Sequence, residues 1–415
     1  MANSLYICYF SMREPLVRTQ VVPYLVELAR GGHRMHLLTF EPELKARWTQ
    51  EEIAAARDEL AGKGVDWHCL AYHKRPSVPA TLFDIAAGAR FVRRFVDEHD
   101  IDILHARVHV PAAMAALARR RTRRRPKILF DIRGFFPEEY TDAGRWKQDG
   151  VVYRAVKRVE RWLMREADGF VVLTEKAREI LFPESRTTGR DAAGRPVEVI
   201  PCCVDLKERF DFDQDEARRE MRRELGVEKR KVIVYAGSFG GWYMTDEMLG
   251  LFTAARAADP NVFALVLTQR DADKIRVQLA ERGFGTGDML VKGVPADELP
   301  RYLAAADVSI SFIKNCYSKQ SSSPTKLAEY LACGLPIIAN RGVGDVDALI
   351  ADNAVGVLID EFTDAEYTRA LADAAALDDA ANRCRDTAKR EFDLETVGGT
   401  RYRRVYDRMN VNGIR

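Results

Sequence analysis

The sequence predicts an α/β protein with two Rossmann-like domains, each a doubly wound parallel sheet, that face each other across a cleft. Apolar runs of strand length alternate with helical patterns along most of the chain, which is typical of βαβ units and parallel sheets. The alternation is interrupted once, between Pro201 and Arg230, by a charged stretch without a strand pattern. The 415 residues also exceed one ordinary core, so two domains of roughly 200 residues are expected.

The N-terminal domain, expected over residues 1–205, begins with a βαβ unit. Residues 5–10 form an apolar run of strand length, and a helical pattern follows the polar loop at residues 11–15. Gly31 and Gly32 end this helix before a second strand at residues 35–40. The same alternation predicts strands at residues 101–105, 127–131, 169–173 and 197–200, and helices at residues 82–98, 111–119 and 151–166.

The C-terminal domain, expected over residues 206–392, repeats this alternation. Strands are predicted at residues 231–235, 262–267, 289–291, 308–311, 335–339 and 355–359. The last segment, residues 393–415, has a charged helical pattern that carries Tyr402, Val405 and Tyr406. We expect this helix to cross back to the N-terminal domain. Ligands of open α/β sheets bind beyond the carboxyl ends of the strands, so we look for site residues in the loops that follow strands.

The composition is that of a soluble globular protein, with 47% hydrophobic and 30% charged residues and a net charge of +2. Seven cysteines without a C-x-x-C pair argue against a disulfide framework or a zinc site and favour cytoplasmic thiols. Cys202, Cys203 and Cys333 are interpreted as packing residues. No run approaches the ~18 apolar residues of a membrane span, and no signal-peptide pattern precedes the first strand. We therefore expect a cytoplasmic protein.

The stretch of residues 321–340 has the pattern of a helix that follows a polar loop and precedes a buried strand. Pro324 is expected in the first turn of the helix, with Ser322 or Ser323 as its N-cap. Gly334 ends the helix. Such a helix N-terminus offers unpaired backbone N–H groups and a partial positive charge, which together make an anion site.

Two further features point to the same ligand. Lys326 adds a full positive charge to the first turn of this helix, and Glu329 follows one turn later, where a carboxylate could accept sugar hydroxyls. A glycine-rich turn at residues 237–241 follows a strand, and its backbone could approach a phosphate closely. A plain strand-to-helix turn is the alternative interpretation. The combination predicts a site for a phosphorylated sugar.

Polar residues also follow two strands of the N-terminal domain. His105, Arg107 and His109 follow one strand and are candidates for catalysis, with a structural role as the alternative. Asp131 and Arg133 follow the next strand along the chain. They could form a buried ion pair that fixes the loop. They could instead place a carboxylate near an acceptor hydroxyl and a guanidinium near a leaving phosphate.

The densest positive charge is the run from Arg119 to Lys127. The amphipathic helix that follows it adds the cations Arg154, Lys157, Arg158 and Arg161 beside Val151, Val152, Trp162 and Leu163. Such a run is usually a solvated helix end. Basic residues beside exposed aromatic side chains also suit an anionic lipid surface, so contact of Arg119–Lys127 with the inner face of the cell membrane is the second interpretation. Nucleic-acid binding is disfavoured because no nucleic-acid module accompanies the run and the net charge is near zero.

Four segments of the chain form an ordered set of motifs. They are Ile-Pro-Cys-Cys-Val-Asp at residues 200–205, Tyr-Ala-Gly-Ser-Phe-Gly at 235–240, Val-Lys-Gly-Val-Pro-Ala-Asp-Glu-Leu at 291–299 and Pro-Thr-Lys-Leu-Ala-Glu-Tyr-Leu-Ala-Cys-Gly-Leu-Pro at 324–336. In this order they resemble the interdomain segment, the glycine turn, the base-framing loop and the donor-binding helix of the retaining GT-B glycosyltransferases of family 4. Weaker signatures in the N-terminal half extend the resemblance over essentially the whole chain.

The resemblance implies specific residue roles. Glu329 matches the second glutamate of the family's E-x7-E motif, whereas the first glutamate is replaced by Ser321. The family's phosphate-binding Arg/Lys pair is also absent, because residues 240–245 contain no cation. The catalytic candidates are Glu329, Lys326, Asp131, Arg133, Arg107 and His105. The donor-binding candidates are Gly237, Ser238, Phe239, Gly240, Arg270, Val294, Ser323, Pro324, Thr325 and Leu327.

The function implied is transfer of a sugar from a nucleotide-sugar donor to a hydroxyl of a glycan or lipid-linked acceptor, with retention, in polysaccharide or glycolipid assembly. No cofactor and no metal are expected, because cations can stabilise the leaving phosphate. The triplet at residues 271–273, Asp-Ala-Asp, is interpreted as a helix start. A UDP or GDP donor is favoured and a CMP-linked donor is left open. The alternatives are a GT-B-fold sugar-nucleotide epimerase and a non-catalytic sugar-nucleotide-binding subunit.

Overall fold

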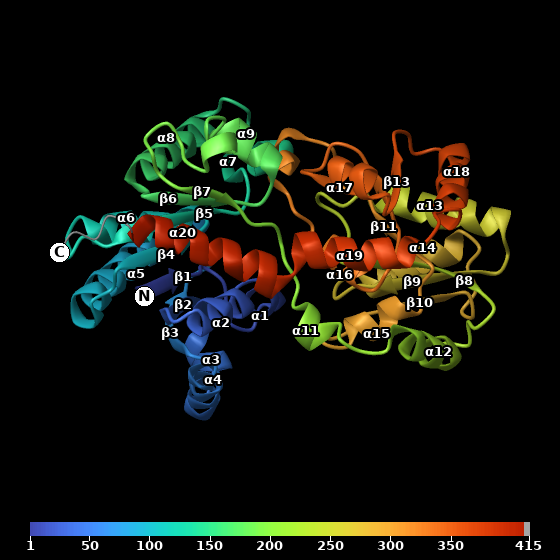
Figure 1. Cartoon of the computed structure of the whole chain (residues 1–415), viewed down its shortest axis with the longest axis horizontal. Coiled ribbons are helices and arrows are strands. Elements are labelled where there is room, and N and C mark those ends of the chain that lie inside the picture. Colours follow the sequence, from blue (N-terminus) through green and yellow to red (C-terminus); the bar gives the residue numbers. More distant parts are fainter. Residues whose placement is uncertain (411–415) are drawn as a thin grey trace. The chain divides into compact units, whose positions relative to one another are not determined.

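The computed structural model describes residues 1–410, and its contacts divide the chain into two compact units. Unit 1 comprises Met1–Pro201 and the C-terminal segment from Val397, and unit 2 comprises Cys202–Thr396. Residues 411–415, the end of the expected last segment, lie outside the described part of the chain. Each unit contains one parallel sheet with helices on both faces, so each is a Rossmann-like domain (Figure 1).

Unit 1 is built on a seven-stranded parallel sheet with the order β3-β2-β1-β4-β5-β6-β7. Its strands are β1 (Asn3–Ile7), β2 (Arg34–Pro42), β3 (Val65–Tyr72), β4 (Ile103–Arg107), β5 (Lys127–Ile132), β6 (Gly169–Val172) and β7 (Val197–Val199). Its helices are α1 (Pro15–Gln20), α2 (Val22–Arg30), α3 (Leu44–Arg47), α4 (Gln50–Gly62), α5 (Ser77–His99), α6 (His109–Arg119), α7 (Phe136–Asp142), α8 (Val151–Glu166), α9 (Glu175–Leu181), α10 (Ser185–Thr188) and α20 (Thr400–Asn410).

The right-handedness of βαβ crossovers decides which face of this sheet each helix covers. The connections through α5, α6 and α8 all progress in one direction across the sheet, whereas the connection through α2 progresses in the other. Therefore α5, α6 and α8 lie on one face and α2 on the other. Contacts of α6 with α5 and α8, and of α2 with α20, agree with this division. The core beneath α5, α6 and α8 includes Met114, Phe130 and Leu163.

Strand β3 was not predicted from the sequence. It is an edge strand paired with β2 alone, and within it only Val65 and Trp67 are buried. Its sequence, Val-Asp-Trp-His-Cys-Leu-Ala-Tyr, therefore mixes polar and apolar residues instead of forming an apolar run.

Unit 2 is built on a six-stranded parallel sheet with the order β10-β9-β8-β11-β12-β13. Its strands are β8 (Lys231–Ala236), β9 (Val262–Leu267), β10 (Met289–Lys292), β11 (Val308–Ser311), β12 (Ile337–Asn340) and β13 (Gly356–Ile359). Its helices are α11 (Leu206–Arg209), α12 (Gln214–Glu224), α13 (Thr245–Ala258), α14 (Ala272–Glu281), α15 (Leu299–Ala304), α16 (Thr325–Ala332), α17 (Val346–Asn353), α18 (Asp364–Ala375) and α19 (Ala380–Phe392), with a 3-10 helix at Tyr317–Ser321. A π-helical turn, Leu394–Gly399, crosses from the end of unit 2 into unit 1 and leads into α20.

Unit 2 has two apolar cores, which include Leu327 of α16 and Phe252 of α13. Cys202, Cys203 and Cys333 are all buried in this unit, as expected of packing residues. Across residues 1–410, no helix combines the length and the apolar character that crossing a bilayer requires.

Candidate functional site

The candidate donor site lies in unit 2 between β8 and β11, where the strand order reverses. Ligands of open α/β sheets bind at such a switch point, beyond the carboxyl ends of the strands. The glycine turn follows β8 at this point, and its Gly237 N–H donates to the Leu267 carbonyl at the end of β9 (2.9 Å). Gly237, Gly240 and Gly241 all have positive φ, a backbone conformation that glycine adopts without strain.

The side chain of Lys326, on the first turn of α16, ends against this glycine turn. Its Nζ donates to the Tyr235 hydroxyl (3.0 Å) and lies over the rings of Tyr235 (4.1 Å) and Tyr243 (4.3 Å). A Cβ built at Gly237 would fall 2.7 Å from Nζ. We call Lys326, Tyr235, Tyr243 and Gly237 the lysine cage. The structure thus brings together two candidates, Gly237 and Lys326, from sequence motifs 89 positions apart (326 − 237).

The lysine cage lowers the proton affinity of its ammonium group. Lys326 is 7% exposed, and burial lowers its pKa from 10.5 to about 7, against the opposing field of Glu329. No carboxylate of the described chain forms an ion pair with Nζ, and the contacts with the two rings are its main compensation. A ligand phosphate at this position would supply the missing negative charge.

Glu329 is held by an arginine that the sequence did not single out. Its Oε1 accepts from Arg209 Nη2 at 2.9 Å, and the same nitrogen donates to the Ala296 carbonyl in the loop after β10 (2.7 Å). Burial raises the pKa of Glu329, although the Arg209 charge opposes this shift. Arg209 lies on α11 within the charged stretch between Pro201 and Arg230, where nothing in the sequence distinguishes one cation from its neighbours.

The start of α16 differs from the prediction. The helix begins at Thr325, Pro324 is the N-cap residue, and no side chain caps the first turn. The expected caps, Ser322 and Ser323, do not form because Ser323 Oγ accepts from the backbone N–H of Cys202 instead (3.1 Å). The terminus therefore lacks a side-chain acceptor, as an anion site requires. Leu327 is buried in the core.

The remaining donor-binding candidates surround the same switch point or line the loops beside it. Val294 is buried and its carbonyl accepts from Gln269, whereas Arg270 is exposed. Phe239 and Gly240 line a cavity of about 290 Å³ together with Lys274. The Ser238 carbonyl accepts a hydrogen bond from the Tyr235 hydroxyl.

Two lysines near the glycine turn were missed by the sequence argument. Lys274, on α14, lines the cavity beside Gly240, and Lys319, in the 3-10 helix, lies over the Trp242 ring at 4.4 Å. Both are distant from the turn in sequence, so the search for a cation within residues 240–245 could not find them. Ser321, at the position of the missing first glutamate, is buried, and its Oγ donates to the Ser318 carbonyl (2.8 Å).

The catalytic candidates of unit 1 form one buried cluster around Asp131. Asp131 Oδ2 lies 3.5 Å from Arg133 Nε, 3.6 Å from His105 Nε2 and 4.0 Å from Arg107 Nη1, and it accepts from the Tyr402 hydroxyl at 2.9 Å. The β4–β5 register sets Arg107 beside Asp131. Burial alone would raise the pKa of Asp131, but Arg133 and His105 hold that pKa well below its usual range.

This geometry supports the buried ion-pair interpretation that the sequence left open. Asp131 and His105 are fully buried, and His105 Nδ1 is within hydrogen-bond distance of the Tyr406 hydroxyl (3.0 Å). The cluster therefore ties α20 to the carboxyl ends of β4 and β5. A direct role of these residues at a substrate stays a prediction. His109 belongs to a different network, with Nε2 at 2.9 Å from Glu160 Oε2 on α8.

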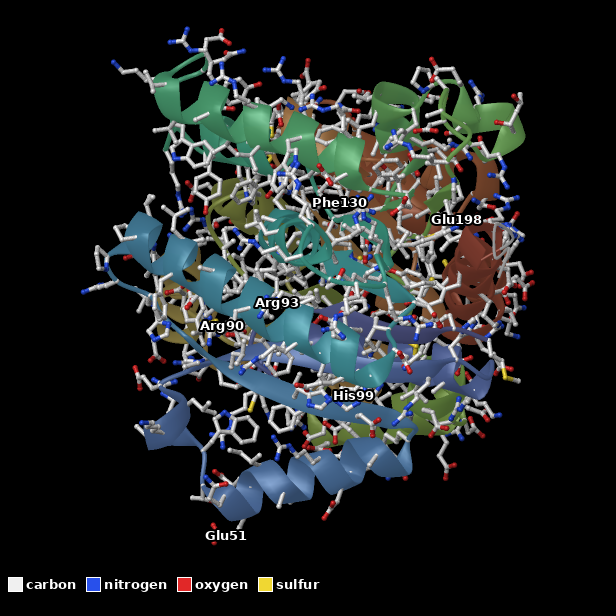
Figure 2. The ribbon with its side chains drawn as sticks, turned by 90° about the vertical axis from the view of Figure 1, so that its left-hand side faces the viewer. Glu51, Arg90, Arg93, His99, Phe130 and Glu198 are labelled. Carbon is white, nitrogen blue, oxygen red and sulfur yellow. The ribbon has the colours of Figure 1, made fainter. Side chains whose placement is uncertain are left out.

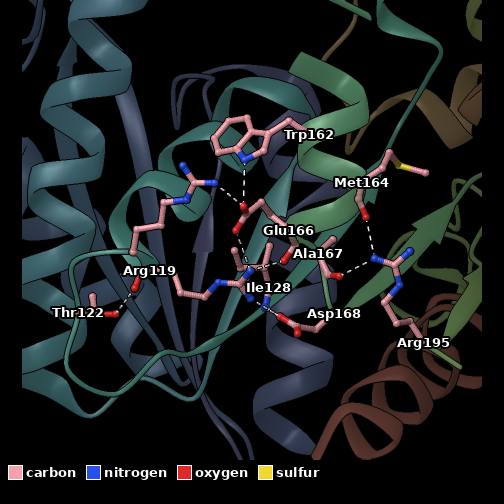
Figure 3. Close-up of polar contacts among 10 residues, drawn as sticks. Arg119, Thr122, Ile128, Trp162, Met164, Glu166, Ala167, Asp168 and Arg195 are labelled. Carbon is pink, nitrogen blue, oxygen red and sulfur yellow. Dashed lines mark hydrogen bonds and ion pairs between the residues drawn. The ribbon is translucent and has the colours of Figure 1, made fainter. Parts of the chain in front are cut away.

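The basic run from Arg119 to Lys127 is engaged largely within unit 1. Arg119 pairs with Glu166 and Asp168 (Figure 3), and Arg120 pairs with Glu166. Arg124 pairs with Asp100, and Lys127 donates to the Met409 carbonyl. Contact of the run with a membrane stays a prediction and is now limited to its remaining cations, Arg121, Arg123 and Arg125.

Trp162, the aromatic residue expected to be exposed beside these cations, is partly buried and hydrogen-bonded. Trp162 Nε1 donates to Glu166 Oε1 at 2.9 Å, and the Arg120 guanidinium lies over its ring at 5.2 Å. Leu163 is buried. The expectation of an exposed aromatic side chain on α8 is therefore wrong, because Trp162 is used to pack the end of the helix against the run.

Comparison with known proteins identifies the class. The model of Glycosyltransferase Family 4 matches residues 18–208, and that of Glycosyl transferases group 1 matches residues 217–391. The GDP-mannose-dependent alpha-(1-6)-phosphatidylinositol monomannoside mannosyltransferase of Mycolicibacterium smegmatis is 26% identical and covers 84% of this chain and 86% of its own. The 2-deoxystreptamine glucosyltransferase of Streptomyces kanamyceticus is 26% identical over 47% of this chain and 48% of its own.

Solved structures share the fold. A glycosyltransferase from Rickettsia africae superposes with a TM-score of 0.71 at 13% identity, covering 99% of both chains. Anabaena HepE in complex with UDP and glucose superposes with a TM-score of 0.68 at 14% identity, covering 98% of this chain and 100% of that one. The two Rossmann-like units and these matches define a GT-B glycosyltransferase. Within that class, the chain belongs to the family 4-like glycosyltransferases.

Proposed function

We propose that the chain transfers a sugar from a nucleotide-sugar donor to a hydroxyl of a glycan or lipid-linked acceptor, with retention, in polysaccharide or glycolipid assembly. The observation that carries the donor part is the lysine cage, in which a buried ammonium group that has no carboxylate partner among residues 1–410 lies against Gly237. A departing phosphate beside this ammonium group and the uncapped start of α16 would be stabilised as its negative charge develops.

Roles follow from position. Lys326 neutralises the leaving phosphate, and Glu329, oriented by Arg209, accepts hydroxyls of the donor. Lys274 and Lys319 are near enough to the glycine turn to replace the family's missing cation pair. These cations make a metal ion unnecessary for phosphate departure. Among the residues that the structure describes, no group of His, Cys, Asp and Glu is arranged to hold a metal.

A UDP or GDP donor is favoured. The related mannosyltransferase is described as GDP-mannose-dependent, and Anabaena HepE has been crystallised with UDP-glucose. A CMP-linked donor stays open, because Ser321 replaces the first glutamate of the E-x7-E motif and residues 240–245 lack the family's phosphate-binding cation pair. The mannosyltransferase is also named for a phosphatidylinositol-linked acceptor, which supports a lipid-linked acceptor.

The test has two stages. Thermal shift against UDP, GDP, ADP, TDP and CMP first identifies the base, since a ligand of the folded state raises the melting temperature by mass action. Radiolabelled transfer from the matching nucleotide sugars to lipid extracts and glycans follows. Lys326→Met and Glu329→Gln should each reduce transfer by about 100-fold or more, as loss of a transition-state contact does. Nucleotide binding without transfer to any acceptor would favour a non-catalytic subunit, and epimerised donor in the absence of acceptor would favour an epimerase.

A further inference from the structure

Helices α5 and α8 form the outer layer of one face of unit 1. They lie on either side of α6, which contacts both and is almost wholly buried. In a parallel α/β sheet, helices run opposite to the strands, so α5 and α8 both start at the carboxyl edge of the sheet. We define the α5–α8 face as the outward side of these two helices.

The outward side of α8 is strongly cationic. It exposes Arg154, Arg158, Arg161 and Arg165, which recur at intervals of three or four residues and so share one side of the helix. Within residues 1–410, none of these four side chains forms an ion pair or a hydrogen bond. The glutamates of the same helix cannot neutralise them. Glu160 is taken by Lys157 and His109, and Glu166 by Arg119 and Arg120.

Helix α5 continues the positive charge across the same face. Arg90, Arg93 and Arg94 are exposed and have no ion-pair partner among the described residues. Figure 2 shows Arg90 and Arg93 on α5, which runs across the view below α8. Exposed Asp97 and Glu98 offset part of this charge at the far end of the helix.

Exposed apolar side chains accompany these arginines at the ends of the helices nearest the carboxyl edge. On α8, Val151 is 76% exposed, and Val152 and Val159 are also exposed. On α5, Val78 is 68% exposed, and Leu82 and Phe83 are also exposed. Single exposed apolar residues are ordinary, but all of these except Val159 lie on the first two turns of the two helices that flank α6, and this grouping marks an interaction surface.

We propose that the α5–α8 face docks on a membrane that contains anionic lipids, with α8 lying in the headgroup layer. Unpaired arginines match anionic headgroups, and the valines, Leu82 and Phe83 match the boundary between headgroups and acyl chains. Nucleic acid would match the arginines and the ring of Phe83 but not Leu82 and the valines, since aliphatic side chains offer no stacking surface for bases. This surface replaces the run from Arg119 to Lys127 as the principal membrane contact, because that run is largely engaged internally.

The carboxyl edge of the unit 1 sheet then lies beside the bilayer. A lipid-linked acceptor would arrive at the edge where ligands of such sheets bind. The inference rests on the proposed function only for the nature of this acceptor. Membrane docking itself is measurable without donor or acceptor, so failure of one does not imply failure of the other.

The experiment is co-sedimentation of the full chain with vesicles of phosphatidylcholine, with or without phosphatidylglycerol. The wild type should bind only the anionic vesicles, and added salt should weaken binding. Arg154→Gln/Arg158→Gln/Arg161→Gln should lower the partition coefficient on the order of 100-fold, because each arginine near an anionic surface contributes separately. Val152→Ser/Val159→Ser should lower it further.

The matched control is Arg121→Gln/Arg123→Gln/Arg125→Gln, which removes the same charge from the basic run and should retain most of the binding. All of these side chains lack ion-pair partners in the described part of the chain, so unchanged melting temperatures are expected. The proposal is overturned if the α8 variant binds as the wild type does, if the control loses the binding instead, or if the wild type binds RNA but not anionic vesicles.

Discussion

The Nζ atom of Lys326 lies where Gly237 has no side chain, and a Cβ at that glycine would be 2.7 Å from it. The two residues therefore constrain each other. Gly237 has a φ of +139°, which side-chain-bearing residues rarely adopt. The close approach of a charged group to bare backbone is the arrangement that a phosphate-binding turn needs.

Gly237→Ala should therefore damage the donor site more than an ordinary glycine substitution. We expect a loss of stability of about 1–3 kcal/mol from the backbone strain and a displaced Lys326. Nucleotide affinity, measured by calorimetry, should fall at least tenfold. Gly241→Ala is the matched control, because it also has positive φ but nothing lies within 4 Å of its Cβ position. Equal losses of affinity in both variants would contradict a specific role of the Gly237–Lys326 contact.

The low pKa of Lys326 predicts a pH dependence of both stability and binding. Its pKa falls from 10.5 to about 7 on folding, so between these values the unfolded chain binds more protons than the folded chain. The contribution of this group to stability thus rises with pH across that window. Lys326→Met should flatten this rise in a series of denaturant titrations.

Nucleotide binding should show the opposite trend. A bound phosphate favours the protonated lysine, so binding takes up a proton and weakens as the pH rises above about 7. Calorimetry in two buffers of different ionisation enthalpy measures the uptake directly. An uptake that persists unchanged in Lys326→Met would assign it to another group.

The fold and part of the donor site could be predicted from the sequence. The residues that could not be predicted are those whose roles depend on contacts with distant parts of the chain. The segment from Pro324 to Glu329 could be located because helix signals are local. Tyr243 and Arg209 could not, because each acquires its role through a contact with α16 that no local pattern encodes. The same reason explains the run beginning at Arg119, because the acidic partners of Arg119, Glu166 and Asp168, lie 47 and 49 positions further along the chain.

The Arg209–Glu329 pair predicts a non-additive effect on stability. Arg209→Gln leaves a largely buried carboxylate without its partner, which should cost about 3 kcal/mol in denaturant unfolding. Glu329→Gln should cost less, because the neutral amide needs no counter-charge. The double variant should be more stable than the sum of the single losses indicates. Additive losses would mean that the 2.9 Å contact contributes nothing to stability in solution.

The Tyr402–Asp131 hydrogen bond tests whether the unit 1 cluster is structural. Tyr402→Phe removes a 2.9 Å bond to a fully buried carboxylate and should cost about 2 kcal/mol of stability. Because Asp131 has a pKa below its usual range, its stabilising contribution is present above its unfolded pKa and is lost as the pH falls through the lower folded value. Asp131→Asn should therefore weaken the dependence of stability on pH in the acid range.

Activity separates the two interpretations of this cluster. If Asp131 and His105 only fix α20 to the sheet, Tyr402→Phe should keep kcat/KM for transfer near that of the wild type at a temperature where both are folded. His105→Gln, which keeps a hydrogen-bonding group facing Tyr406, should behave in the same way. A fall of 100-fold or more in kcat for His105→Gln, with an unchanged melting temperature, would instead show that the histidine acts on the reaction. Loss of a purely structural hydrogen bond would lower the melting temperature of the variant as well.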